Sequence, residues 1–164
     1  MKKSLIILFF FVSIVEASAS IKNKIIRNLE NTDNLTFNFE QNINGKTQNG
    51  NCILSFQKKI FCQYNLKNNK ILVSNGKSIV IKTSASYYLY PLERTPLNLI
   101  LNKDFLLKKI KILNERKIDD KFINFRFSEN DFEINLFFDF IDYNLIGWQT
   151  TDIYQNLSIT FLSS

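Results

Sequence analysis

Apolar and polar residues alternate along most of this 164-residue chain, and this alternation constrains the fold more than any other feature of the sequence. Leu35, Phe37 and Phe39 alternate with polar residues. The same alternation recurs in Ile123, Phe125 and Phe127, in Phe132, Ile134, Leu136, Phe138 and Phe140, and in Leu157, Ile159 and Phe161, which we expect to lie on one apolar face. A period of two places successive side chains on opposite faces of a β-strand. About ten or eleven such strands are expected, without the strand–helix alternation typical of a parallel sheet. The sequence therefore predicts one long antiparallel sheet.

Turn signals separate these strands. Asn-Gly pairs at residues 44–45, 49–50 and 75–76 are typical of tight turns, because both residues tolerate a positive φ. The chain is therefore expected to form a meander in a single domain, without linker or internal repeat.

Only two short helices are expected beside this sheet. Ile21, Ile25, Ile26 and Leu29 recur on one side of a helix of about ten residues. Thr95 as N-cap and Pro96 at the first helical position begin the second helix, whose apolar face is Leu97, Ile100 and Leu101. A wide sheet with one continuous apolar face must curl, and its concave side then encloses either a packed core or a ligand cavity. The pattern alone leaves both alternatives open.

The first 19 residues are typical of a secretory signal peptide. Lys2 and Lys3 precede an apolar run from Leu5 to Val15, and Ala17-Ser18-Ala19 provides small residues for cleavage after Ala19. The alternative is a short buried N-terminal helix. The apolar run is too short to cross a bilayer core, which needs about 20 residues, and no later segment is longer. We therefore expect an exported, periplasmic domain, residues 20–164, that does not span the membrane.

The composition argues against catalysis. The chain has no histidine, which removes the commonest general base and transition-metal ligand. Its four glycines form no phosphate-binding motif, and the acidic pairs at residues 119–120 and 129–131 lie in turn-like stretches. The formal net charge of +6 would suit nucleic acid or an anionic membrane, but the basic residues are scattered along the chain. We predict a monomer that is not an enzyme and has no metal, cofactor or nucleic-acid partner.

Cys52 and Cys62 are the only cysteines and lie in the segment NCILSFQKKIFCQY. A turn near Gln57-Lys58-Lys59 makes the two cysteines cross-strand partners, at a separation near that of a disulfide. A redox pair or half of a zinc site are the alternatives, but neither the C-x-x-C spacing nor a histidine is present. In an exported protein the simplest interpretation is a disulfide. Parity places Leu54, Phe56, Ile60 and Tyr64 on the same face as the cysteines.

The order of segments resembles the LolA family of periplasmic lipoprotein carriers. The matching segments are FNFEQ, the hairpin ending in Tyr64, ILVSNGKSIVI, LYPL, TPLNLIL and the C-terminal IGWQTTDIYQNLSITFL, with Trp148, Asp152 and Thr160. The resemblance implies a mainly β fold with a few short helices: a strongly curved, unclosed antiparallel half-barrel with a helical lid over an apolar cavity. It also implies acylated lipoproteins as cargo, an inner-membrane lipoprotein-releasing ABC transporter as donor and an outer-membrane acceptor.

From parity and resemblance together, the residues expected to form the acyl-binding cavity and its lid are Phe37, Phe39, Leu54, Phe56, Tyr64, Ile79, Ile81, Leu97, Ile100 and Leu101. The family often has Arg-Pro near the tip of the second hairpin, implicated in holding the lid. Phe56, Gln57 or Lys58 stands there in this chain, so Lys58 is the candidate latch. Family members also often have a further C-terminal strand. The alternatives are a binder of a free small lipid or other apolar ligand, and a non-catalytic structural module of the envelope.

Overall fold

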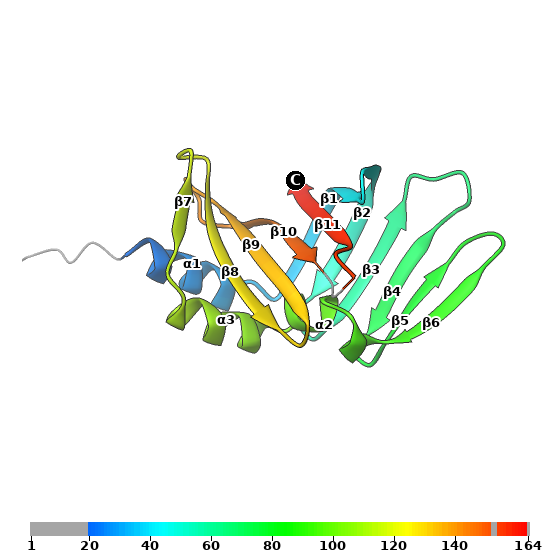
Figure 1. The fold of residues 1–164 in the computed structure, drawn as a ribbon, viewed down its shortest axis with the longest axis horizontal. Coiled ribbons are helices and arrows are strands. Elements are labelled where there is room, and N and C mark those ends of the chain that lie inside the picture. Colours follow the sequence, from blue (N-terminus) through cyan, green and yellow to red (C-terminus); the bar gives the residue numbers. More distant parts are fainter. Residues whose placement is uncertain (1–19, 152–153, 164) are drawn as a thin grey trace, which may run out of the picture.

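The computed structural model describes residues 20–151 and 154–163, so the expected signal peptide and Asp152 lie outside the described residues. Within these residues, eleven strands form one antiparallel sheet that curves without closing (Figure 1). The strands are β1 (Asn34–Ile43), β2 (Lys46–Ser55), β3 (Lys59–Tyr64), β4 (Ile71–Asn75), β5 (Ser78–Lys82), β6 (Tyr87–Pro91), β7 (Arg116–Ile118), β8 (Phe122–Glu129), β9 (Phe132–Asp139), β10 (Leu145–Thr151) and β11 (Leu157–Ser163). The expected mainly β, antiparallel, unclosed architecture is confirmed.

The strand order β6-β5-β4-β3-β2-β1-β11-β10-β9-β8-β7 joins two meanders at the centre of the sheet. There the first strand pairs with the last, with Phe39 opposite Leu162 and Gln41 opposite Thr160. The strands β6 and β7 are the two free edges. One half of the sheet therefore consists of β2–β6 and the other of β7–β10, with β1 and β11 between them.

Two-residue turns set the register of several hairpins. Asn44 and Gly45 both have positive φ (48° and 84°), as do Asn130 and Asp131 (49° and 66°), which is the geometry that tight hairpins require. The Asn49-Gly50 pair is different, because it lies inside β2 rather than in a turn. Gly50 stands opposite Phe39 on one side and Tyr64 on the other, and the Phe39 ring and the backbone of Gln63 and Tyr64 occupy the space where a side chain would lie. The sequence expectation of a turn at this pair is wrong.

Two short helices are expected from the sequence, and the described residues contain three α-helices: α1 (Ile21–Glu30), α2 (Leu97–Ile100) and α3 (Lys103–Ile112), with a 3-10 turn at Leu92–Arg94. Ser20 caps α1 and Asn102 caps α3, since each side chain accepts a backbone N–H of the first turn. Thr95 has an extended backbone before the helical Pro96, but its hydroxyl donates to the Leu92 carbonyl and so does not cap α2.

The main core lies between the helices α1 and α3 and the strands β8 and β9 (Figure 1). Ile25, Leu106 and Ile110 contribute the helical side, and all three are fully buried. The strands contribute Phe125 and Phe138, whose rings meet edge to face. This half of the sheet is filled, whereas the half beyond β1 receives no long helix. None of the helices in the described part of the chain is long and apolar enough to cross a membrane.

Candidate functional site

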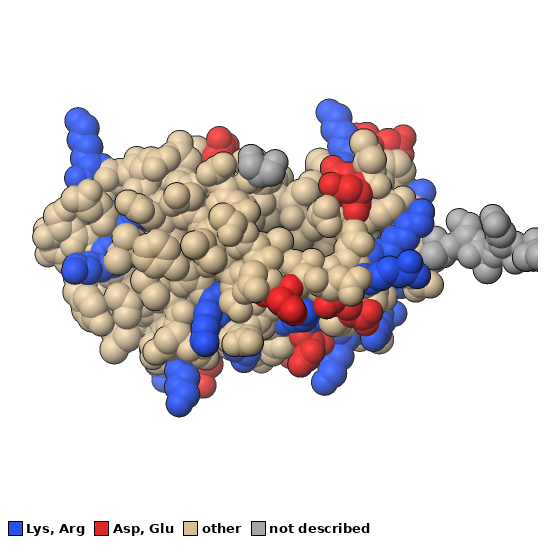
Figure 2. All heavy atoms as spheres, turned by 180° about the vertical axis from the view of Figure 1, so that it is seen from behind, with Lys and Arg blue, Asp and Glu red and all other residues tan. Residues whose placement is uncertain are grey.

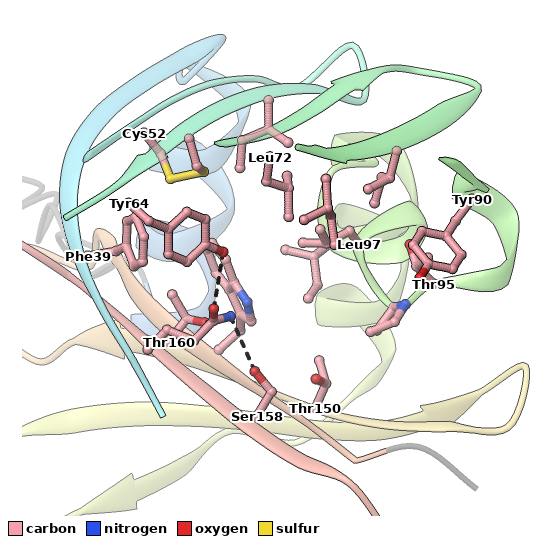
Figure 3. Close-up of a pocket in the computed structure, with 18 of the residues that line it drawn as sticks. Phe39, Cys52, Tyr64, Leu72, Tyr90, Thr95, Leu97, Thr150, Ser158 and Thr160 are labelled. Atoms are coloured by element: carbon pink, nitrogen blue, oxygen red, sulfur yellow. Dashed lines mark hydrogen bonds between the residues drawn. A yellow bond between two sulfur atoms is a disulfide. The ribbon is translucent and has the colours of Figure 1, made fainter. Parts of the chain in front are cut away.

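A cavity of about 390 Å³ lies on the inner face of the sheet, where the long helices do not reach. This volume is within the range of ligand pockets, roughly 300–1,000 Å³. Figure 3 shows the disulfide and Leu72 on one side of the cavity, Thr150 and Ser158 on the opposite side, and Leu97 with Tyr90 at a third. The strands β1–β6, β10 and β11 and the helix α2 all contribute to its wall.

The apolar wall follows from cross-strand pairing. Cys52 pairs with Cys62, which pairs with Leu72, which pairs with Ile81, so one inward row crosses β2, β3, β4 and β5. The two cysteines form the expected disulfide, with their Cα atoms 4.1 Å apart. Two edge-to-face ring pairs continue the wall, Phe39 with Tyr64 at 4.9 Å between centroids and Phe37 with Trp148 at 6.4 Å.

The helix α2 covers one side of the cavity through Leu97 and Ile100. It is a single turn of four residues. Helices this short are marginal by themselves, so its position depends on its tertiary contacts. Ile100 is fully buried against the core, whereas Leu97 is only partly buried and faces the cavity.

One hydrogen bond ties α2 to the hairpin of β2 and β3. The Lys58 Nζ atom donates to Asn98 Oδ1 at 2.9 Å. The Lys58 backbone is held in turn, because the Ser74 hydroxyl donates to the Lys58 carbonyl at 2.9 Å. Next to it, Gln57 forms an isolated antiparallel bridge with Asn102, directly after α2. The tip of the β2–β3 hairpin, which carries the candidate latch Lys58, therefore contacts the expected lid.

A polar ledge of Gln41, Tyr64, Thr150, Ser158 and Thr160 interrupts the apolar wall (Figure 3). The Tyr64 hydroxyl donates to Gln41 Oε1 at 3.2 Å. The Gln41 amide donates to the hydroxyls of Ser158 and Thr160, at 3.3 and 3.2 Å. In the described structure Ser158 and Thr160 serve only as acceptors, so their own hydroxyl protons remain to be donated to a ligand.

The ledge is neutral. Burial raises the pKa of Tyr64 to about 12, so its hydroxyl stays protonated at physiological pH. Burial also lowers the pKa of Lys70, whose Nζ atom lies 3.9 Å from the Tyr64 ring centroid and donates to Gln48. No charged side chain is among the described residues that line the cavity. A buried carboxylate or phosphate would therefore lack a direct counter-charge there.

The structure brings most of the predicted cavity residues together. Phe37, Phe39, Tyr64, Ile79, Ile81, Leu97 and Ile100 all line the cavity. Leu54, Phe56 and Leu101 do not, because they are buried in the core under the lid and the helices. They are on the correct face of their elements, but that face covers both the filled core and the cavity. Parity cannot distinguish these two parts of one inner surface.

The polar ledge was missed by the sequence interpretation. Leu157, Ile159 and Phe161 were expected to form the inward row of the last strand, but Ser158 and Thr160 face the cavity instead. Leu157 and Phe161 are among the exposed apolar residues. The signal that finds the ledge is the pairing of β11 with β1, because Gln41 continues the inward row of Phe37 and Phe39 and lies opposite Thr160. Pairing of the first strand with the last is not visible in the local pattern.

Metal chemistry finds no support at this site. Among residues 20–151 and 154–163, no group of three or more histidine, cysteine, aspartate or glutamate side chains is placed to hold a metal ion. Both cysteines are in the disulfide. The arrangement consists of an apolar cavity, a neutral hydrogen-bonding ledge and a short covering helix.

Comparison with known proteins yields similarity in fold only. No protein-family model matches the chain, and no curated protein matches it. A LolA superfamily protein from Nitrosomonas europaea aligns over 88% of this chain and 90% of its own, with 6% identity and a TM-score of 0.47. The lipoprotein LppX of Mycobacterium tuberculosis aligns over 87% of this chain and 91% of its own, with 10% identity and a TM-score of 0.43. Likenesses this distant carry no argument about ligand, so the functional proposal depends on the cavity itself.

Proposed function

We propose that this protein is a periplasmic carrier that binds the acyl chains of lipoproteins and moves them from the inner to the outer membrane without chemistry on the cargo. The observation that carries the proposal is the apolar cavity of about 390 Å³ under a single-turn apolar helix. Exposing a chain of about 14–16 carbons to water costs on the order of 11–13 kcal/mol, at about 0.8 kcal/mol per methylene. A carrier must remove this cost and still release its cargo.

The lid of this cavity suits reversible binding. When α2 moves away from the β2–β3 hairpin, it breaks the hydrogen bond that Lys58 donates to the neutral side chain of Asn98. The same movement uncovers Leu97. A hydrogen bond of this kind contributes only about 1–3 kcal/mol. The lid can therefore yield to an entering chain, which gains much more by burial. Lys58 stands near the hairpin position where the LolA family often has an arginine, and we assign it the role of the latch.

The ledge specifies how the cargo is oriented. Ester and amide carbonyls accept hydrogen bonds, and the hydroxyls of Thr150, Ser158 and Thr160 are placed to donate them. A free fatty acid would bring a carboxylate into a cavity lined by neutral side chains. Acyl chains joined through an ester or amide, as in a lipoprotein, therefore fit better than free fatty acids. The alternative function, binding of a free small lipid, would for the same reason be restricted to neutral lipids.

The test is to express the whole chain with its own signal in a diderm bacterium and to purify it from the periplasm. Mass spectrometry of the co-purified material should find acylated lipoproteins. Leu97→Asp places a charge at the cavity and should abolish their retention. Ile112→Asp is the matched control, since Ile112 is 76% exposed on α3 and outside the cavity.

Each outcome decides between the alternatives. Lipoproteins bound by the native protein and the control, but lost from Leu97→Asp, would support the carrier. Neutral lipids alone would favour the small-lipid binder. No bound lipid, or equal retention by Leu97→Asp, would contradict the proposed function and the assignment of α2 as the lid.

A further inference from the structure

The half of the sheet that carries the cavity is charged differently from the rest of the molecule. Residues 41–92 contain seven lysines and no aspartate or glutamate, whereas the rest of the chain holds 14 basic and 15 acidic side chains. These residues form β2–β6 and their turns, with the last residues of β1. In Figure 2 most acidic side chains lie on the right-hand half, away from this region. Lysines that are scattered along the sequence are therefore gathered in space.

Five of these seven lysines are exposed and can contact an external partner. Lys46, Lys59, Lys67, Lys77 and Lys82 are exposed. The ion pairs found in the described residues are all formed by other cations, on α1, α3 and β8. With no carboxylate in the same segment, the lysine charges are not neutralised locally.

An apolar row crosses the outer face of the same half. Ile53 pairs with Phe61, Phe61 with Val73, Val73 with Val80 and Val80 with Leu89, so the row spans β2 to β6. Ile53, Phe61 and Leu89 are 57%, 43% and 60% exposed. Lys59 and Lys82 point to this outer face, since they follow the parity of Phe61 and Val80. The face is thus apolar along its middle and basic at its sides.

The edge strand β6 adds three tyrosines, Tyr87 on the outer face beside Lys82, and Tyr88 and Tyr90 on the cavity face opposite Ile81 and Ile79. Tyr87, Tyr88 and Tyr90 are 63%, 50% and 45% exposed, and the rings of Tyr88 and Tyr90 stack at 6.4 Å. Tyrosine is enriched where a protein meets the polar–apolar boundary of a bilayer. Tyr90 also lines the cavity (Figure 3), so this edge lies beside the cavity wall.

We propose that the β2–β6 half, with its outer apolar row, the β6 tyrosines and the acid-free set of lysines, docks on the surface of a bilayer containing anionic phospholipid. Apolar side chains that enter the headgroup boundary and lysines that attract anionic lipids are the two contributions by which proteins bind reversibly to such surfaces. A docked β6 brings the cavity to the membrane, where an acyl chain can move between bilayer and cavity with little exposure to water. The docking surface and its lipid stand independently of which acyl cargo the cavity binds.

The test measures co-sedimentation of residues 20–164 with two kinds of vesicle, phosphatidylethanolamine with a minority of phosphatidylglycerol, and pure phosphatidylcholine. We expect the protein to bind the anionic vesicles. This binding should weaken when the salt concentration rises from ~0.1 M to ~1 M, because the Debye screening length falls from about 10 Å to about 3 Å. The double variant Lys59→Gln/Lys82→Gln should bind on the order of 25-fold more weakly, about fivefold for each lysine near the surface. Leu89→Asp should also lose binding.

Matched controls lie on the other half of the molecule, on α3 and in the turns beside β8 and β9. Lys108→Gln/Lys121→Gln removes two exposed lysines there, and Ile141→Asp alters a residue that is 84% exposed. Both should bind as the native protein does, and circular dichroism checks that every variant is folded. Binding to phosphatidylcholine as strong as to the anionic vesicles, or an equal loss in the controls, would overturn the proposal. Failure of the native protein to bind anionic vesicles would also overturn it, leaving an anionic protein as the partner for this face.

Discussion

At the scale of single residues, Tyr64 connects packing, hydrogen bonding and titration. Its pKa is raised to about 12 by burial, against an ordinary value of 10.0. The folded state thus keeps the phenol proton while the unfolded state loses it between about pH 10 and pH 12. The contribution of the protonated Tyr64 to the free energy of unfolding is therefore complete below pH 10 and is lost as the pH rises through 12. A shift of about two pH units corresponds to about 2.7 kcal/mol.

We expect Tyr64→Phe to remove this part of the pH dependence. Near neutral pH the variant should be less stable by about 0.5–1.5 kcal/mol, since Gln41 loses its donor. Towards pH 12 the difference should shrink and then reverse. Urea unfolding of both proteins at several pH values measures it, and Tyr87→Phe is the control because Tyr87 is exposed. Parallel curves for Tyr64→Phe and the native protein would show that Tyr64 titrates normally.

Gly50 gives a second prediction at this scale. In a strand, alanine is ordinarily more stable than glycine by about 0.5–1 kcal/mol. At position 50 a Cβ atom would overlap the Gln63 carbonyl oxygen and come within 2.9 Å of the Phe39 ring. We therefore expect Gly50→Ala to destabilise the protein by about 1–3 kcal/mol, as overpacking does. Asn51→Ala, at the exposed neighbouring position, should change stability little in the same denaturation experiment.

An increase in stability for Gly50→Ala would mean that the backbone of β2 can shift to accept the methyl group. The position also shows the limit of sequence reasoning for single residues. Asn-Gly indicates a turn when only neighbours in the sequence are considered. Glycine is required at position 50, however, by close contacts with the two adjacent strands, β1 and β3. Cys52 and Cys62 were predictable because their pairing depends on one short hairpin. The inward Ser158 and Thr160 were not, because a one-residue change of register exchanges the two faces of a strand.

At the scale of elements, the contact between the β2–β3 hairpin and α2 makes a testable lid. Lys58→Met keeps the length of the side chain but removes its donor to Asn98. We expect the α2 amides to exchange with solvent at least about fivefold faster, from the loss of about 1–3 kcal/mol. Lys59→Met is the matched control, since the adjacent Lys59 is exposed and points to the outer face.

Hydrogen exchange followed by mass spectrometry measures this difference. Unchanged α2 protection in Lys58→Met would show that the bridge between Gln57 and Asn102, rather than the lysine, holds the lid. Among the elements, the helix after Thr95 was predictable from Pro96, and its apolar face from spacing. The helix α3 was not expected. Its buried pair Leu106 and Ile110 has helical spacing, but Phe105, Leu107 and Ile112 add apolar side chains on other sides and obscure the period.

At the scale of the whole molecule, one curved antiparallel sheet was predictable from alternation and turns, because these are local signals. The division of its inner face was not. A filled core lies under α1 and α3, and a cavity lies where those helices end, although both parts carry the same apolar parity. The gathering of positive charge was equally hidden. It becomes apparent only when the acid-free stretch of residues 41–92 is seen to fold as one half of the sheet.

This division predicts that the two halves differ in local stability. The strands β8 and β9 bury six large side chains against α1 and α3, whereas β4–β6 contribute only Ser74 and Ile79 to the buried set. Regions with few buried apolar contacts open at lower free energy. We expect the amides of β4–β6 to exchange at least about tenfold faster than those of β8 and β9, a difference of at least about 1.4 kcal/mol.

An acylated peptide should then slow exchange in β4–β6 and α2, because the ligand supplies the core that this half lacks, and should leave β8 and β9 nearly unchanged. The same peptide without its acyl chain is the control. Equal exchange in both halves of the free protein would indicate one cooperative unit already packed throughout. Protection gained only in β8 and β9 would place the ligand away from the cavity. The expected pattern instead makes incomplete packing the means by which the protein accepts an acyl chain and gives it up.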